Sequence, residues 1–272
     1  MAIIMKSLKS ILEASILANI DDQLESGDEA LKSAVEKFID ENYNYKFIEI
    51  SDKMNDDGKF VVNGFGNIGF NGRNGSTSLT NGMFVWGYVE KQFSCEYCDD
   101  LESLEGAPSF VGGTFSCAGN DKLKDLKGAP KEIEGSFYCS ECPSLVSLKG
   151  GPEVVNGDFN CDECYSLISL KDAPKQIYGS FNCNSCEKLK SLEGAPDHVP
   201  NSFICANCIS LKSLKGAPKK VNNFVCDGCK KLKSLKNAPV EVKRNFYCIE
   251  CGMKFTEDDV RNESKVKGKI YC

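Results

Sequence analysis

The stretch from Ile133 to Pro152 reads I-E-G-S-F-Y-C-S-E-C-P-S-L-V-S-L-K-G-G-P, and it is one copy of a unit that recurs along most of the chain. The spacing of the copies is 22 residues, with one step of 21. The first cysteines of the copies are Cys95, Cys117, Cys139, Cys161, Cys183, Cys205, Cys226 and Cys248. A fixed period of this length is typical of a solenoid, in which each repeat stacks on its neighbours and buries a continuous core.

Each copy predicts one turn of the solenoid. A phenylalanine precedes the first cysteine by two residues, as Phe137 precedes Cys139, and this alternation predicts a strand with both side chains facing inward. Two leucines three residues apart, such as Leu145 and Leu148, fit a short 3₁₀-like or irregular return limb. The Gly-Ala-Pro segment turns the chain, and a Val or Ile four residues before the next Phe closes the coil.

The N-terminal region has the 3-and-4 apolar spacing of helices over residues 5–42, interrupted at Asp21-Asp22. A second helix is expected over Asp28–Asn42, with Ser26 and Glu29 as a capping box. Its apolar stripe is Leu31, Val35, Phe38 and Ile39. We interpret this region as a cap for the open end of the solenoid. Residues 1–20 could instead be a detachable sorting or docking peptide, and membrane-surface binding is disfavoured because the polar face lacks a basic cluster.

From Tyr45 the apolar period falls to two, which predicts strands over Lys46–Ile50 and Lys59–Val62 joined by a turn at Asn55–Gly58. A degenerate copy of the repeat then starts near Gly66, with the apolar pair Ile68 and Phe70 in place of the later Phe and Cys. The sole tryptophan, Trp86, is expected to pack in this β cap.

The C-terminal end departs from the repeat. Thr256 is expected to cap a helical turn over Phe255–Val260, and Val266–Cys272 predicts one last strand. The chain therefore divides into a helical segment (1–44), a β cap with a degenerate repeat (45–88), the repeats (89–252) and a C-terminal cap (253–272).

Written as F-x-C-x-x-C/N-x-x-L-x-x-L, the unit resembles the leucine-rich-repeat core L-x-L-x-x-N/C-x-L. The second cysteine of each copy falls on the Asn/Cys ladder position, which Asn120 occupies in the second copy. The S-L-x-G-A-P-x-x-V signature is similar to short leucine-rich-repeat-like proteins of bacteria and of tailed phages, especially gut-associated ones. The resemblance covers about residues 66–272. It implies a parallel β-strand solenoid, leucine-rich-repeat-like, that serves recognition or assembly and is not an enzyme.

Phe and Cys replace Leu on the strand and the return limb is short, which leaves the curvature open. The opening K-S-L-K-S-I-L-E-A-S also looks like N-terminal peptides of proteins packaged into phage heads, and Ile11–Ala14 fits the short cleavage pattern of prohead proteases. The expected location is therefore the cytoplasm of a bacterial host or the interior of a phage particle.

The recurring C-x-x-C invites two other interpretations, a zinc site and a redox site. Zinc requires four converging ligands, whereas a solenoid arranges equivalent side chains in straight columns about 4.8 Å apart. A redox motif favours a helix N-terminus, and here the motif lies at a strand exit. We therefore expect no cofactor, and we expect the cysteines to behave as small buried apolar residues. Sixteen cysteines would suggest disulfides in a short secreted chain, but their spacing here is that of the repeat. Because no signal peptide is recognisable either, we expect a reducing compartment with free thiols.

The charge is distributed unevenly. The net charge is -6, and residues 1–60 carry 13 acidic and 7 basic side chains, whereas residues 209–244 carry 10 basic and 2 acidic ones. The lysines of the basic stripe are Lys212, Lys215, Lys219, Lys220, Lys230, Lys231, Lys233 and Lys236. We interpret the stripe as a solvated edge, with a phosphate-rich ligand as the alternative. The net charge and the lack of interleaved aromatic residues argue against nucleic acid, and no apolar run approaches the roughly 18 residues of a membrane-spanning helix.

The outward face of the strands is the candidate binding surface, because its middle is polar and acidic and its last copies are apolar. The candidate residues are Tyr138, Asp158, Asn160, Asp162, Asn182, Asn184, Ile204, Val225, Tyr247 and Ile249. These side chains could also simply suit a sheet. The expected partner is another protein, with no small-molecule substrate. The one histidine, His198, is expected in an exposed turn without a catalytic partner.

Overall fold

The computed structural model describes residues 27–43, 48–72 and 76–272. The chain forms two compact units, residues 1–41 and 42–272. Of the described residues, 27–42 are helical, and all of them but Asn42 belong to the first unit. Val35 and Ile39 are fully buried, and Leu31 and Phe38 are partly buried, which confirms the predicted helix and its apolar stripe. The predicted helix and sorting peptide in residues 1–20 and the Ser26 cap lie outside the described residues.

The second unit opens with a β cap. Strands β1 (Ile48–Met54) and β2 (Phe60–Gly64) pair antiparallel, with the predicted turn closed by the bond from Gly58 N to Asn55 O at 2.9 Å. Strand β4 (Phe84–Val89) joins β2 in parallel. Trp86 is buried against Phe84 and Phe93, with ring centroids 5.8 and 5.7 Å away, so its predicted packing role is confirmed.

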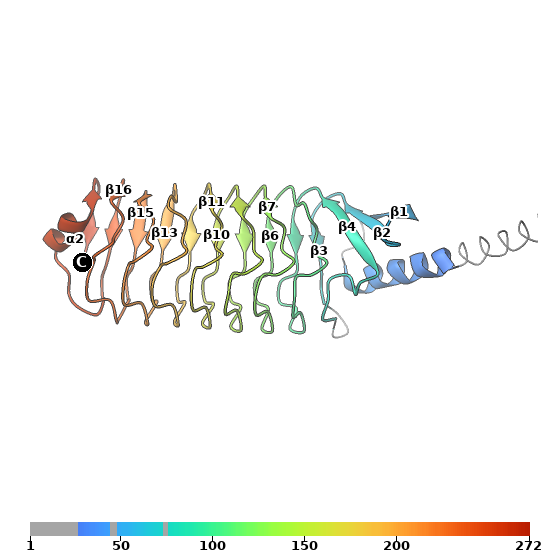
Figure 1. Ribbon diagram of the computed structural model, residues 1–272, viewed down its shortest axis with the longest axis horizontal. Coiled ribbons are helices and arrows are strands. Elements are labelled where there is room, and N and C mark those ends of the chain that lie inside the picture. The colour runs from blue at the N-terminus through green and yellow to red at the C-terminus, as the bar shows by residue number, and fades with distance from the viewer. Residues whose placement is uncertain (1–26, 44–47, 73–75) are drawn as a thin grey trace, which may run out of the picture. The chain divides into compact units, whose positions relative to one another are not determined.

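The body of this unit is a ten-stranded parallel sheet with one strand from each turn, as Figure 1 shows. Its strands in spatial order are β3 (Ile68–Gly69), β5 (Phe93–Ser94), β6 (Phe115–Ser116), β8 (Phe137–Tyr138), β10 (Phe159–Asn160), β12 (Phe181–Asn182), β13 (Ser202–Ile204), β15 (Asn223–Val225), β17 (Phe246–Tyr247) and β19 (Ile270–Tyr271). Ile68 pairs with Phe93, so the degenerate first copy is in register. The parallel β-solenoid predicted from the period is confirmed.

Two further short sheets run alongside, and they carry the Val or Ile that closes each coil. Their strands are β7 (Glu132–Ile133), β9 (Val154–Val155) and β11 (Gln176–Ile177) in one, and β14 (Lys220–Val221), β16 (Glu241–Val242) and β18 (Lys265–Val266) in the other. The isolated bridge between His198 and Lys220 continues this row. His198 is exposed as predicted, but it lies in a bridge and not in a free turn.

The core consists of straight columns of identical residues. The strand phenylalanines two residues before each first cysteine, from Phe93 to Phe246, are fully buried, and adjacent rings of this column lie 5.2 to 5.9 Å apart. The first cysteines form the next column and the leucines of the return limb form two more, all almost without solvent exposure. This continuous apolar interior is the main source of stability.

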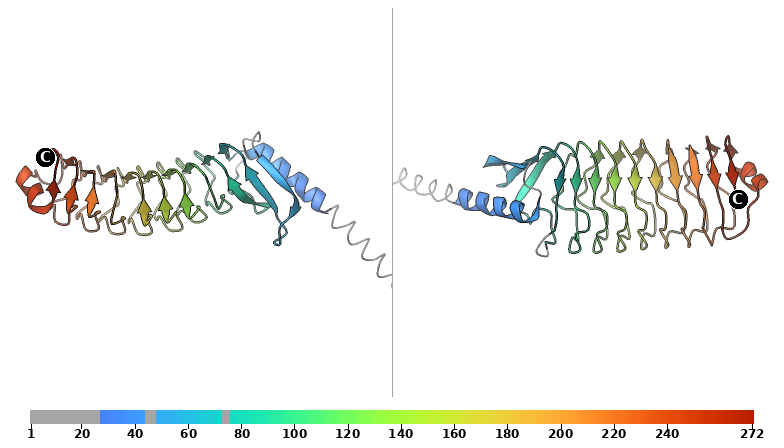
Figure 2. Two further views of the ribbon diagram at one scale, coloured as in Figure 1. Left: turned by 90° about the horizontal axis from the view of Figure 1, so that it is seen from above. Right: turned by 180° about the vertical axis from the view of Figure 1, so that it is seen from behind.

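The return limb is irregular. Its tight turns are closed by bonds such as those from Leu145 N to Cys142 O at 3.0 Å and from Gly151 N to Leu148 O at 3.1 Å. Glu141 (φ 54°) and Gly150 (φ 84°) adopt left-handed conformations, so each turn of the chain needs two residues that tolerate positive φ. Figure 2 shows these limbs from above and from behind.

The C-terminal cap also agrees with the sequence. Helix α2 (Glu257–Glu263) begins after Thr256, whose hydroxyl accepts from Asp259 N while the Asp259 carboxylate accepts from Thr256 N. The last strand, β19, pairs with β17 and places Ile270 beside Phe246. No described helix is long and apolar enough to cross a membrane.

Candidate functional site: the outward face of the sheet

The strand register aligns six of the ten candidate residues in one outward column. The column contains Tyr138, Asn160, Asn182, Ile204, Val225, Tyr247 and Tyr271, one from each successive strand. All of them are partly exposed. At the C-terminal end, Tyr247 and Tyr271 stack with ring centroids 4.6 Å apart and an interplanar angle of 4°. The face is therefore polar in its middle and apolar and aromatic at this end.

In the middle of the face, polar side chains bond to the backbone of the next turn. Ser136 Oγ accepts from Asp158 N at 3.0 Å, and Asp158 Oδ1 accepts from Ser180 N at 2.6 Å. Side chains preceding each phenylalanine therefore act as a ladder that ties successive strands together. Asp158 was predicted from the sequence only as a binding residue. These hydrogen bonds show that it also has a structural role.

The asparagines of the middle turns are engaged in the same way. Asn160 Oδ1 accepts from Asp162 N at 3.0 Å, and Asn182 Oδ1 accepts from Asn184 N at 3.1 Å. Asn184 donates to Ser185 Oγ at 3.0 Å. These bonds hold the strand exits in shape, and they leave fewer polar atoms for a ligand.

Asp162 differs from its neighbours. Its Oδ1 is buried without a hydrogen-bond partner, and burial, together with the nearby Glu163 charge, raises the pKa of its carboxyl. An unsatisfied acceptor in this position favours the protonated form.

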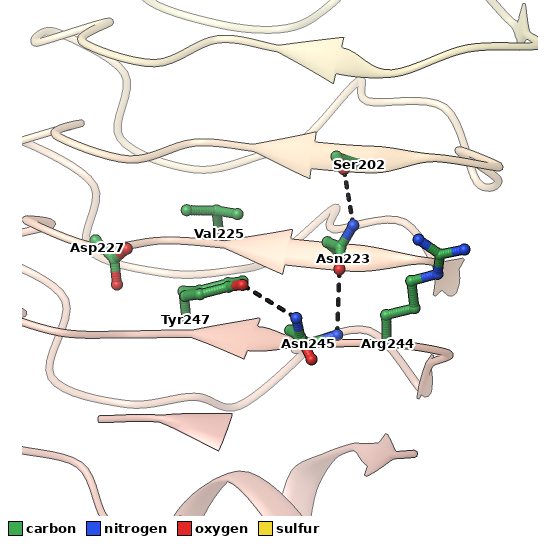
Figure 3. A pocket seen from close by; sticks show the side chains of 7 residues that line it. All are labelled: Ser202, Asn223, Val225, Asp227, Arg244, Asn245 and Tyr247. Atoms are coloured by element: carbon green, nitrogen blue, oxygen red, sulfur yellow. Dashed lines mark hydrogen bonds between the residues drawn. The ribbon is translucent and has the colours of Figure 1, made fainter. Parts of the chain in front are cut away.

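A groove of about 480 Å³ lies on the apolar end of the face. It spans the turns that carry β13, β15 and β17, as Figure 3 shows. Its lining is Ser202, Asn223, Val225, Asp227, Arg244, Asn245 and Tyr247. Two of the predicted residues, Val225 and Tyr247, thus meet in one groove. Ile204 is the column neighbour of Val225, and Ile249, on the turn after β17, is 43% exposed.

Arg244 is a groove residue that sequence reasoning missed. It stands two residues before Phe246, where the earlier copies have Gly135, Gly157 and Gly179. Aligning the copies of the repeat would have pointed to this residue, because it is an arginine at a position where those copies have glycine. Arg244 is exposed and has no ion-pair partner among the described residues.

At the opposite end of the groove lies Asp227 (Figure 3). Its Oδ1 accepts from Ile249 N at 2.6 Å. Burial raises the pKa of its carboxyl, an effect that the bond from Ile249 partly offsets. The groove therefore has a cation at one end, a carboxyl at the other, and Val225 and Tyr247 between them.

The cysteine columns are occupied by thiols that bond within the protein. All sixteen cysteines are free. From Cys142 onward, the ladder cysteines donate to the carbonyl of a first cysteine in the preceding turn, as in Cys164 Sγ to Cys139 O at 3.1 Å and Cys186 Sγ to Cys161 O at 3.3 Å. Asn120 donates to Cys95 O in the same way, at 2.9 Å, so it occupies an equivalent place.

Burial raises the pKa of the Cys142 thiol to about 11, which keeps it protonated at neutral pH. Metal coordination and nucleophilic chemistry both need the thiolate. Among residues 27–43, 48–72 and 76–272, no group of three or more His, Cys, Asp or Glu side chains is arranged to hold a metal ion.

Among the described residues, some lysines of the stripe form an ion pair and others form none. Lys215, Lys219 and Lys230 form ion pairs with an acid one turn away: Glu193 at 2.7 Å, Asp197 at 3.4 Å and Glu250 at 3.0 Å. Lys230 also lines a groove of about 650 Å³ with Lys212, Lys231 and Lys233. Part of the stripe is thus the solvated, paired edge that its composition suggests, and part is a concentrated positive surface.

The fold and this face define the class of the protein as a parallel β-solenoid built from 22-residue repeats. No protein-family model, curated protein or solved structure matches the chain.

Proposed function

We propose that the protein is a non-enzymatic recognition or assembly solenoid whose outward sheet face binds another protein. The observation that carries the proposal is the open groove over β13, β15 and β17, where Val225 and Tyr247 are partly exposed between polar ends. An apolar centre with a polar rim is the usual composition of a protein-binding surface. A flat row of strands on a rigid core presents such a surface without rearrangement.

The proposed setting is the cytoplasm of a bacterial host or the interior of a phage particle. The repeat signature resembles proteins of bacteria and tailed phages. A core that contains many closely spaced free thiols is also compatible with a reducing compartment. A virion-packaged protein with a removable leader is part of this proposal. Mass spectrometry of the protein from particles tests it, and an intact segment 1–20 there would contradict processing.

The binding face is tested by a pull-down with the double variant Ile204→Asp/Tyr247→Asp. A matched control carries the same substitutions at side chains away from the outward column, Ile168→Asp/Tyr178→Asp, which are 60% and 61% exposed. We expect wild type and control to retain one common partner and the face variant to lose it, with all three showing the same circular dichroism. Equal retention by all three would reject this face as the binding surface.

The competing interpretation is a zinc or redox protein. Elemental analysis and a thiol count on the native protein separate the two. We expect no stoichiometric zinc, and fast alkylation only at the exposed Cys272 and the partly exposed Cys251. Stoichiometric zinc, or rapid reaction of many thiols in the folded protein, would favour the competing interpretation.

A further inference from the structure

We propose that the groove over β13, β15 and β17 binds a carboxylate of the partner, with Arg244 as its main contact. This inference rests on the proposed function of the sheet face, and it specifies the chemistry that the face selects. It follows from which hydrogen-bond donors and acceptors of the groove already have a partner within the protein.

The amide acceptors of the groove are occupied by backbone donors. Asn223 Oδ1 accepts from Asn245 N at 3.2 Å, and Asn245 Oδ1 accepts from Lys269 N at 3.0 Å. In Figure 3 the bond between Asn223 and Asn245 links adjacent strands. A ligand that offers N–H or O–H donors therefore finds few unused acceptors at this end.

The hydroxyl groups of the groove, in contrast, have a donor hydrogen that no described residue accepts. Ser202 Oγ accepts from Asn223 Nδ2 at 3.1 Å, and Tyr247 OH accepts from Asn245 Nδ2 at 3.1 Å. Each hydroxyl oxygen is thereby supplied with a donor, and no described residue accepts the hydrogen of either hydroxyl. A hydroxyl carries one donor hydrogen besides its lone pairs. These two hydroxyls are available to an acceptor on the ligand.

Arg244 adds a full positive charge to these donors. Its side chain extends from its own turn toward the turn of Asn223 (Figure 3), and no acidic side chain pairs with it among the described residues. A guanidinium presents a planar fork of N–H groups that matches the two oxygens of a carboxylate. The unused hydrogens at this end belong to the guanidinium and the two hydroxyls, and an anion accepts from all of them.

The carboxyl of Asp227 does not cancel this preference. Asp227 lies at the opposite end of the groove from Arg244 (Figure 3), and its Oδ1 already accepts from Ile249 N at 2.6 Å. Val225 lies between Asp227 and Arg244 and offers an apolar contact. The preferred ligand is therefore a peptide carboxylate next to an apolar side chain.

The test uses two small probes that differ only in the carboxylate, N-acetyl-leucine and N-acetyl-leucinamide, titrated into the full ¹⁵N-labelled chain. We expect saturable amide shifts in residues 223–247 with the acid and none with the amide. The variant Arg244→Gln should bind the acid at least about tenfold more weakly, as expected for loss of a charge-assisted bond. The control Lys243→Gln removes the same charge one residue away and should change the affinity less than about twofold.

Equal shifts with both probes, or unchanged binding of the acid by Arg244→Gln, would overturn the inference. Failure of the broader proposal looks different: the pull-down would then be insensitive to Ile204→Asp/Tyr247→Asp. If that variant loses the partner while Arg244→Gln retains it, the face binds protein but does not use a carboxylate.

Discussion

At the scale of single residues, the second position with positive φ in each turn, such as Gly194, places the strictest limit on which side chains fit. Gly194 has φ +100°, and a Cβ there would lie 2.4 Å from Lys171 N and 2.5 Å from Leu170 C. Both are backbone atoms, so the clash cannot be relieved by a side-chain rotation. We expect Gly194→Ala to lower the free energy of unfolding by about 3 kcal/mol, measured as a shift of the urea midpoint.

The control is Asp172, which occupies the same position one turn earlier with φ 67°. Because that turn already accommodates a Cβ, Asp172→Gly should change the free energy of unfolding by less than about 1 kcal/mol. If Gly194→Ala were as mild as Asp172→Gly, the close approach of adjacent turns would not be the constraint.

The ladder position gives a second prediction. Asn120 is fully buried and makes three bonds: Nδ2 donates to Cys95 O at 2.9 Å and to Cys117 O at 2.8 Å, and Oδ1 accepts from Cys98 N at 2.9 Å. Asn120→Ala removes all three and leaves buried backbone groups unsatisfied. We expect a loss of about 3 kcal/mol or more.

Cys142→Ala is the matched comparison in the next turn. Its Sγ donates only to Cys117 O, at 3.4 Å, and that carbonyl keeps its bond from Asn120. We expect this variant to lose about 1–2 kcal/mol, measured by the same urea titration. A cost equal to that of Asn120→Ala would mean that volume, and not hydrogen bonding, sets the residue at this position.

Single residues also show which structural roles can be predicted from the sequence and which cannot. The inward position of Phe137 and Cys139 follows from alternation alone, and the structure confirms it. The roles of Asp158 and Arg244 do not follow, because they depend on what the adjacent turn presents at a distance of 22 residues. Asp158 directly precedes Phe159 and Arg244 stands two residues before Phe246, and neither position by itself shows whether a side chain bonds to the next turn or faces solvent.

At the scale of elements, the phenylalanine column should respond locally to a mutation. Phe159 is fully buried between Phe137 and Phe181, with ring centroids at 5.6 and 5.2 Å. Phe159→Ala leaves a cavity that the neighbouring rings cannot fill without leaving their own turns. We expect a loss of about 3–5 kcal/mol, and faster amide exchange in the adjacent turns than in distant ones.

Tyr178→Ala is the control for this prediction, because Tyr178 is 61% exposed. It should change the free energy of unfolding by less than about 0.5 kcal/mol. Uniform acceleration of exchange along all ten strands after Phe159→Ala would show that the array opens as one cooperative unit and not turn by turn.

Some strands and helices could be predicted from the sequence more completely than others. The hairpin of β1 and β2 and the start of α2 carry local signals, a turn sequence and an N-cap threonine, and both are confirmed. The second row of strands, such as β9 and β11, was predicted only as a closing Val or Ile. Two-residue strands have no period of their own, so pairing with the next turn creates them.

At the scale of the whole molecule, the repeat period alone predicts the solenoid, because each copy can bury its apolar face only against the next. The chemistry of the surface is not periodic, and this is why the proposed binding site was the least predictable part. The stacked turns hold the groove in a fixed shape. Residues that differ from those of the other copies, such as Arg244, determine its charge and polarity.

The buried thiols give the solenoid a predicted limit at alkaline pH. Burial raises the pKa of Cys142 to about 11, from the ordinary value of 9.0, and raises the pKa of the fully buried Cys95, Cys117 and Cys139 as well. The folded state therefore holds these protons more tightly than the unfolded state. The resulting stability is fully present below pH 9 and is lost as the pH rises through the folded-state pKa values.

Cys142 alone should remove about 2–3 kcal/mol between pH 9 and pH 11, and the other buried thiols add to this loss. We expect the urea midpoint to be nearly constant from pH 7 to about pH 8.5 and to fall steeply above pH 9. Cys272→Ser, which replaces the exposed terminal thiol, should leave the profile unchanged, whereas Cys142→Ala should make the decline less steep. A midpoint that stays constant to pH 11 would mean that the thiols ionise as easily in the folded core as in water, which would contradict their burial.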